Sequence, residues 1–202
     1  MKKINFTIPL KTKLYIFLFL MSFCAFSQEL PPIVKYASTT YGAGNQNWMI
    51  SQDQNQSVFF ANNEGLLEFN GSNWELYPSP NETIVRSVKV IGTKIYTGCY
   101  MEFGFWTRQA NGKLKYTSLS KTIKTQILND EQFWNILNYE QWVIFQSLDR
   151  IYIYDTKTGG FKIIAPKNNI TKSFRTKNAI YFQSVNEGLF EIESGKVRLA
   201  SN

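Results

Sequence analysis

The chain contains a repeating unit built from short apolar strands. Its two clearest copies are FFANNEGLLEFNGSNW at 59–74 and YFQSVNEGLFEIESGKV at 181–197, which share an aromatic pair, a polar stretch, Glu-Gly-Leu and a turn with glycine. Two weaker copies begin near Ile95 and Val143. The aromatic landmarks of the copies are separated by 36, 49 and 37 positions: Phe60, Tyr96, Phe145 and Phe182. A period of about 40 residues made of short strands is typical of the blades of a β-propeller.

Each copy is flanked by a further apolar segment on either side, which gives four strands per unit. Strands are predicted before the copies at 48–51, 85–91, 133–137 and 170–174, and after them at 74–77, 114–119, 161–164 and 197–199. Turn dipeptides such as Asn70-Gly71 and Asn111-Gly112 tolerate positive φ and can close short connections. The sequence therefore predicts an all-β fold of about four four-stranded propeller blades. Their approximate bounds are 45–81, 82–120, 130–167 and 168–202.

Residues 29–44 precede the first blade and contain IVKYA at 33–37, which predicts a leader strand. In many propellers an N-terminal strand completes the last blade and so removes an exposed edge. The fourth unit here already has its own outer strand, so we expect the four blades to be part of a larger ring. The alternative is a compact four-bladed ring in which 33–37 is a cover strand.

The first 28 residues follow the order of a secretory signal. Four lysines between residues 2 and 13 precede an apolar run at 14–26, and Ala25-Phe26-Ser27 forms a small-x-small cleavage site. An apolar run of about 13 residues is short for a membrane span of about 20. We therefore predict a signal peptide at 1–28, cleavage after Ser27 or Gln28, and a periplasmic chain with no membrane span after cleavage.

Composition argues against several classes of function. Removal of the four signal lysines leaves 18 basic and 15 acidic residues, so the net charge falls from +7 to +3 and nucleic-acid binding is not favoured. The chain has no histidine, the commonest metal ligand and general base, and we expect neither a metal nor a cofactor. Cys99 would be the one cysteine left after cleavage. It can form no intramolecular disulfide, and we expect a small buried side chain.

The motifs NQNWMISQD, FFANNEGLLEFNGSNW, VRSV, EFGFW and KLKYTSL occur in this order between residues 45 and 119. Together they resemble the start of the periplasmic sensor region of Bacteroidetes two-component-regulator propeller proteins. Those proteins include hybrid sensor kinases and relatives with a LuxR-type helix-turn-helix, and the resemblance covers about 30–119. It implies a signal peptide, a propeller of seven or more blades, a triple-tyrosine domain, a membrane span and a cytoplasmic output module.

This chain departs from that plan after its fourth blade. It has no second hydrophobic span, no helix-turn-helix pattern and no histidine to accept a phosphoryl group. We therefore expect it to be at most the sensing part of such a regulator, with output domains missing beyond its C-terminus, or a truncated remnant of that part. The apolar faces of the first and last blades could alternatively make it a homodimer.

The candidate binding face is the one where the inner strand of each blade begins. It would collect amides, carboxylates and aromatic rings from three blades: Gln46, Asn47, Trp48, Asn62, Asn63, Glu64, Arg86, Tyr100, Glu102, Trp134, Asn135 and Asp149. Aromatic faces beside polar groups suit a sugar, which has apolar C–H surface and many hydroxyls. The alternative is that Trp48 and Trp134 lie between blades as part of the core.

Three classes of function remain open. The leading hypothesis is an extracytoplasmic sensor module that recognises a glycan or another small ligand and is not catalytic by itself. The second is a secreted propeller enzyme, such as a glycoside hydrolase or polysaccharide lyase, which would use carboxylates from the set Glu64, Glu102, Asp149 and Glu187. Those side chains could equally cap or solvate turns. The third is a protein-binding scaffold.

Overall fold

The computed structural model describes residues 9–22, 30–193 and 196–201. The chain divides into two units, Met1–Lys35 and Tyr36–Asn202. The first unit contains helix α1, Leu10–Ser22, whose 13 residues include much of the predicted signal run. Within the described ranges, none of the helices combines the length and the apolar character that crossing a membrane requires. The predicted cleavage site lies outside the described residues.

The second unit is built from four antiparallel sheets, each of four strands connected in chain order. The strands are β1 (Asn47–Gln52), β2 (Val58–Asn62), β3 (Gly65–Phe69) and β4 (Trp74–Tyr77), then β5 (Ser87–Ile91), β6 (Lys94–Gly98), β7 (Phe103–Arg108) and β8 (Leu114–Ser118), then β9 (Asn135–Tyr139), β10 (Trp142–Gln146), β11 (Ile151–Asp155) and β12 (Phe161–Ile164), then β13 (Ile170–Arg175), β14 (Ile180–Ser184), β15 (Gly188–Glu193) and β16 (Lys196–Ser201). Two short helices accompany them, α2 (Ser38–Tyr41) and the 3-10 segment η1 (Ser120–Gln126). The predicted all-β class with four four-stranded blades is confirmed.

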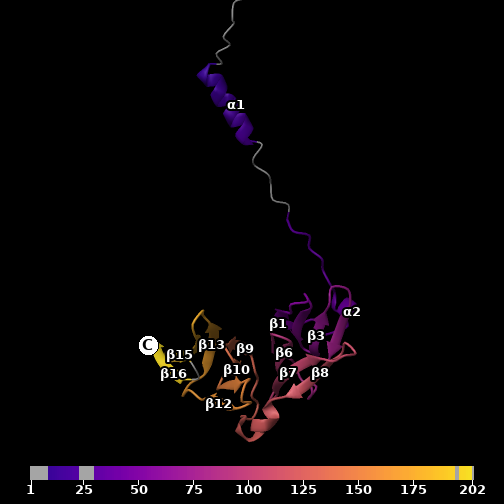
Figure 1. The fold of residues 1–202 in the computed structure, drawn as a ribbon, viewed down its shortest axis with the longest axis vertical. Coiled ribbons are helices and arrows are strands. Elements are labelled where there is room, and N and C mark those ends of the chain that lie inside the picture. Colours follow the sequence, from indigo (N-terminus) through magenta and orange to yellow (C-terminus); the bar gives the residue numbers. More distant parts are fainter. Residues whose placement is uncertain (1–8, 23–29, 194–195, 202) are drawn as a thin grey trace, which may run out of the picture. The chain divides into compact units, whose positions relative to one another are not determined.

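The first strand of each blade is its inner strand. β1 lies beside β5, β5 beside β9, and β9 beside β13. Figure 1 shows the four sheets following one another in chain order, with the first and fourth at opposite ends of the row. The residues at which these inner strands begin are therefore brought to one place, although they come from separate parts of the sequence.

Two inner strands begin two residues later than predicted, at Ser87 and Asn135. The cause is hydrogen bonding between blades. The backbone N–H of Val85 donates to the carbonyl of Asn62 in the first blade, and that of Phe133 donates to the carbonyl of Cys99 in the second. The residues just before β5 and β9 thus link each blade to the one before it.

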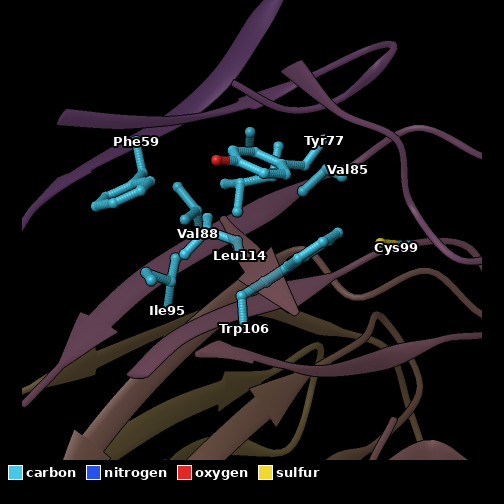
Figure 2. Packing of buried hydrophobic residues seen from close by; sticks show 10 residues of the cluster. Phe59, Tyr77, Val85, Val88, Ile95, Cys99, Trp106 and Leu114 are labelled. Atoms are coloured by element: carbon cyan, nitrogen blue, oxygen red, sulfur yellow. The ribbon is translucent and has the colours of Figure 1, made fainter. Parts of the chain in front are cut away.

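Apolar cores fill the spaces between neighbouring blades. Side chains alternate between the two faces of a strand, so a middle blade can contribute one set of residues to each neighbour. Figure 2 shows the core between the first two blades, where Phe59 and Tyr77 lie against Val88, Ile95 and Trp106. The indole Nε1 of Trp106 donates to the hydroxyl of Thr97 at 3.0 Å, which satisfies its one polar group inside this core. Similar cores join the second blade to the third and the third to the fourth.

The segment at 33–37 does not form the predicted leader strand. Within the second unit, the Tyr36 ring instead packs against Phe69 and Trp74, with centroids 5.5 and 5.3 Å apart. The Tyr41 ring, at the end of α2, lies 5.4 Å from Trp74. Side-chain packing on the outer strands of the first blade therefore takes the place of backbone pairing.

Candidate functional site

Three of the predicted site residues meet where the inner strands begin. Trp48 is the second residue of β1, while Arg86 and Trp134 directly precede β5 and β9. The guanidinium carbon of Arg86 lies 4.2 Å from the ring centroid of Trp48 and 4.7 Å from that of Trp134. The two indole rings are 6.0 Å apart with an interplanar angle of 75°. We call these three residues the Trp-Arg-Trp cluster.

Hydrogen bonds to neighbouring amides hold the cluster in position. The indole Nε1 of Trp48 donates to Oδ1 of Asn63 at 2.8 Å, and Nδ2 of Asn63 donates to Oε1 of Gln46 at 3.4 Å. Nε of Arg86 donates to Oε1 of Gln132 at 2.8 Å. Gln132 was not among the predicted residues, although it lies two positions before Trp134 in the segment that leads into β9.

The cluster is partly open to solvent. The Trp48 side chain is 39% exposed, and Arg86 and Trp134 are half-buried. Trp48 is therefore not the interblade core residue of the alternative interpretation. Burial lowers the pKa of Arg86, but a guanidinium starts from so high a value that it stays charged at neutral pH. A cation over indole rings contributes about 0.5–2 kcal/mol, so the rings help to fix the position of the charge.

Four further predicted residues belong to the first blade next to the cluster. Asn62 is buried and has a structural role, because its Nδ2 donates to the carbonyl of Gly44 at 2.6 Å and to Oδ1 of Asn47 at 2.8 Å. Its Oδ1 accepts from the backbone N–H of Glu64 at 3.0 Å and so closes the turn between β2 and β3. Asn47 and Glu64 are exposed, Asn63 is half-buried, and these three can contact a ligand.

Glu102 does not join the cluster. Its Oε1 accepts hydrogen bonds from the hydroxyls of Tyr116 at 2.9 Å and Ser118 at 2.7 Å, both on β8 of the same blade. Tyr100 donates its hydroxyl to the carboxylate of Asp130, and this hydrogen bond raises the pKa of Tyr100. The two hydrogen bonds from β8 show that Glu102 stabilises the outer part of the second blade. Its position just before β7 in the sequence did not predict this structural role.

The other two candidate carboxylates lie in the turns of the third and fourth blades. Asp149 accepts from the side-chain amide of Asn169 at 3.1 Å. Glu187 accepts from the Ser184 hydroxyl and from the backbone N–H of Asn168, and the Ser184 hydrogen bond is the main cause that lowers the pKa of Glu187. A general acid for glycoside hydrolysis needs a raised pKa, so Glu187 is shifted in the opposite direction.

Sequence reasoning missed a buried carboxylate, Glu131. Only 3% of this residue is exposed. Oε1 accepts from the Ser147 hydroxyl at 2.5 Å, while Oε2 accepts from the Tyr152 hydroxyl at 2.6 Å and from the backbone N–H of Leu128 at 2.9 Å. Glu131 lies in the polar stretch NDEQ, which has the composition of an ordinary loop. Asn135, by contrast, was among the predicted residues. Its Nδ2 donates to the carbonyl and hydroxyl of Ser173 and so links the third blade to the fourth.

Two hollows lie away from the cluster, on the first and second blades. One, of about 520 Å³, lies over the outer strands of the first blade and is lined by Tyr36, Tyr41 and Trp74 among others. The second, of about 330 Å³, is lined by residues that include Asp53 and Arg108. Across residues 9–22, 30–193 and 196–201, no group of three or more Cys, Asp or Glu side chains is arranged to hold a metal ion.

No protein-family model matches the chain, and no curated protein matches it either. Solved structures do. Two structures of the extracellular domain of one B. thetaiotaomicron protein have TM-scores of 0.59 and 0.60 at 18% and 20% identity. That protein is described as a one-component system in one case and as a hybrid two-component system in the other. Each match covers 80% of this chain but 22% of the other, so the chain spans about a fifth of their length.

Two further structures show how widely the fold is shared. An ancestral GH74 enzyme has a TM-score of 0.59 at 15% identity, and the match covers 79% of this chain and 24% of that one. The WD40 β-propeller domain of Doa1 has a TM-score of 0.53 at 13% identity, and the match covers 74% of this chain and 51% of that one. At such identities the likeness shows the fold. The second unit of the chain is thus a set of β-propeller blades, and its structural neighbours include a regulator of the class that its sequence motifs resemble.

Proposed function

We propose that this chain is the ligand-recognition part of an extracytoplasmic sensor and that it binds a glycan or another small ligand at the Trp-Arg-Trp cluster. The observation that carries the proposal is that three blades contribute Trp48, Arg86 and Trp134 to one partly exposed group. Residues that converge from separate blades on an accessible surface are better suited to a ligand than to the packing of any one blade.

The chemistry of the surroundings fits a saccharide. Indole rings offer a flat apolar surface for the C–H groups of a sugar ring. The side-chain amides of Gln46, Asn47 and Asn63 lie on the same side of the first blade and can donate to and accept from hydroxyls. Trp48 is already oriented by its hydrogen bond to Asn63, so little side-chain entropy would be lost on binding.

The comparisons support a sensor more than an enzyme. The B. thetaiotaomicron neighbours are described as extracellular domains of a regulatory system, whereas another neighbour is described as a GH74 enzyme. In this chain Glu102, Asp149 and Glu187 are engaged in hydrogen bonds within or between blades, whereas the fourth candidate, Glu64, is exposed. A single remaining candidate does not supply the pair of carboxylates that glycoside hydrolysis uses. We therefore propose a non-catalytic module. The signal-like N-terminus and the extracellular neighbours support a periplasmic location. We propose that further domains of a longer protein supply the signal output, or that two copies of the chain pair as a homodimer.

The test is binding of a glycan panel to the full chain, measured by tryptophan fluorescence and by thermal shift. We expect a subset of glycans to bind, and Trp48→Ala and Trp134→Ala to weaken that binding at least tenfold. Phe174→Ala is the matched control, because Phe174 has the same 39% exposure but lies on the fourth blade away from the cluster. Folded protein that binds no glycan, or binds equally well without Trp48, would contradict the proposal. Product analysis of the same mixtures would reveal turnover if the chain were an enzyme.

A further inference from the structure

We infer that the Trp-Arg-Trp cluster selects acidic saccharides, with the guanidinium of Arg86 binding a carboxylate of the ligand. The inference rests on the proposed function, since it names the ligand class of the same site. It follows from how the donors of Arg86 are used, from the charges around it and from the rings beside it.

The donors of Arg86 are only partly used within the protein. A guanidinium has five N–H groups in one plane. The guanidinium carbon lies against two indole rings, 4.2 Å from the centroid of Trp48 and 4.7 Å from that of Trp134. The Nε–H is taken by Oε1 of Gln132 at 2.8 Å. Among the described residues, the two terminal amino groups, with four N–H bonds, have no hydrogen-bond partner. They remain for a ligand and form the fork that binds a carboxylate in a bidentate way.

The groups that contact the guanidinium of Arg86 among the described residues are uncharged. Ion pairs within the described residues are formed by Arg108, Lys113 and Arg198, each with a glutamate. The contacts of Arg86, by comparison, are two indole rings and an amide. Partial burial, which also lowers its pKa, weakens the screening of this charge by water. An anionic group at the open edge would therefore be attracted more strongly than at a lysine on the surface.

The rings favour an acidic sugar over an acidic peptide. A uronic acid has a carboxylate at the edge of a ring whose C–H face can stack on indole. Trp48 provides a partly exposed indole directly against the guanidinium, and the amides of Gln46 and Asn63 lie next to it. An acidic peptide would supply the carboxylate but not the flat apolar face.

The experiment compares an acidic oligomer with its neutral methyl ester, which has the same sugar backbone. The full chain is titrated with oligogalacturonate and with the fully methyl-esterified oligomer at constant ionic strength, and tryptophan fluorescence reports binding because two indoles lie in the site. A charged hydrogen-bonded pair corresponds to roughly tenfold to hundredfold in affinity. We expect the acidic oligomer to bind at least tenfold more tightly than its ester, and this comparison needs no variant protein.

Variants then assign the effect to Arg86. Arg86→Gln should remove the preference for the acidic oligomer, and Arg86→Lys should recover only part of it because an ammonium lacks the fork. Arg175→Gln, an equal loss of charge at an exposed residue of the fourth blade, should leave binding unchanged. Circular dichroism of each variant checks that it is folded.

Each contrary result overturns a defined part of the reasoning. Equal binding of the acidic oligomer and its ester, or of the acidic oligomer to Arg86→Gln, would overturn the carboxylate inference and leave the proposed glycan recognition standing. Equal binding of a triglutamate peptide would overturn the saccharide class. If neither the acidic oligomer nor any neutral glycan bound to folded protein, the inference and the proposed function would both fall.

Discussion

The buried carboxylate of Glu131 offers a graded test of how the third blade is held together. Two buried hydroxyls, from Ser147 and Tyr152, donate to it, and so does the backbone N–H of Leu128. Glu131→Gln keeps the shape of the side chain but leaves one acceptor oxygen where there were two. Glu131→Ala removes both acceptors and leaves space behind. The two substitutions should therefore differ in cost in a predictable order.

The magnitude follows from the donors that lose their acceptor. An unsatisfied buried donor costs about 1–3 kcal/mol. Both hydroxyls have a weaker fallback, because Ser147 can donate to the Arg150 carbonyl at 3.2 Å and Tyr152 to the Gln126 carbonyl at 3.4 Å. We therefore expect the free energy of unfolding to fall by about 2–4 kcal/mol in Glu131→Ala and by about 1–2 kcal/mol in Glu131→Gln.

Thermal unfolding of the full chain, followed by tryptophan fluorescence, measures these differences. For a domain of this size, 1 kcal/mol corresponds to about 2–4 °C in Tm, so Glu131→Ala should melt roughly 4–16 °C lower. Glu64→Gln is the control, because Glu64 is exposed and its change should stay within about 0.5 kcal/mol. Combining Glu131→Ala with Tyr152→Phe should cost less than the sum of the two. If Glu131→Ala melted like the wild type, the reasoning that this carboxylate organises the blade would be refuted.

Three further predictions concern packing, thiol reactivity and pH. Gly98→Ala would place a Cβ 2.6 Å from the Cβ of Phe133 and 2.9 Å from its carbonyl oxygen. The free energy of unfolding, measured by urea titration, should therefore fall by about 1–3 kcal/mol. An unchanged urea midpoint would contradict the close packing of the second and third blades. Burial raises the pKa of the Cys99 thiol, so iodoacetamide at pH 8 should modify this cysteine only in denaturant. Peptide mapping measures the modification, and rapid labelling of the folded protein would contradict the burial of Cys99. The hydrogen bond from Lys113 lowers the pKa of Glu75, so this pair stabilises the fold above the unfolded pKa of the carboxyl and ceases to do so as pH falls through the folded value. Because both groups are partly exposed, Glu75→Gln should cost less than about 1 kcal/mol at pH 7 and nothing at low pH, whereas a pH-independent difference would show that charge is not the cause.

Much of the fold could be read from local pattern. Alternating apolar residues and glycine-containing turns act within a few positions, so the strands at 74–77 and 161–164 were predicted with the bounds that β4 and β12 have. The strand predicted at 33–37 was wrong for a reason that is not local. The Tyr36 ring packs on the aromatic side chains of β3 and β4, and no periodicity in the five residues could show that contact.

The candidate site was only partly predictable for the same reason. Glu102 and Asn62 are residue types common in ligand-binding sites. In the structure, however, Glu102 accepts hydrogen bonds from β8, and Asn62 closes the turn between β2 and β3. Glu131 looked like an ordinary loop residue and is instead buried among hydroxyl groups. A polar residue near a turn has the same sequence pattern in either role, because what differs is the set of partners that distant segments bring to it.

The sequence by itself determined the repeat, the four strands of each blade and which strand comes first, since these depend on turn chemistry and on alternation along a short stretch. The sequence also predicted that Trp48, Arg86 and Trp134 share one face, but the tertiary structure alone decided that these three side chains contact one another. Their contact depends on the packing of β1 beside β5 and of β5 beside β9, and this packing is set by the apolar cores between whole blades. Distances between residues in different blades are fixed by those cores, and no local pattern encodes them.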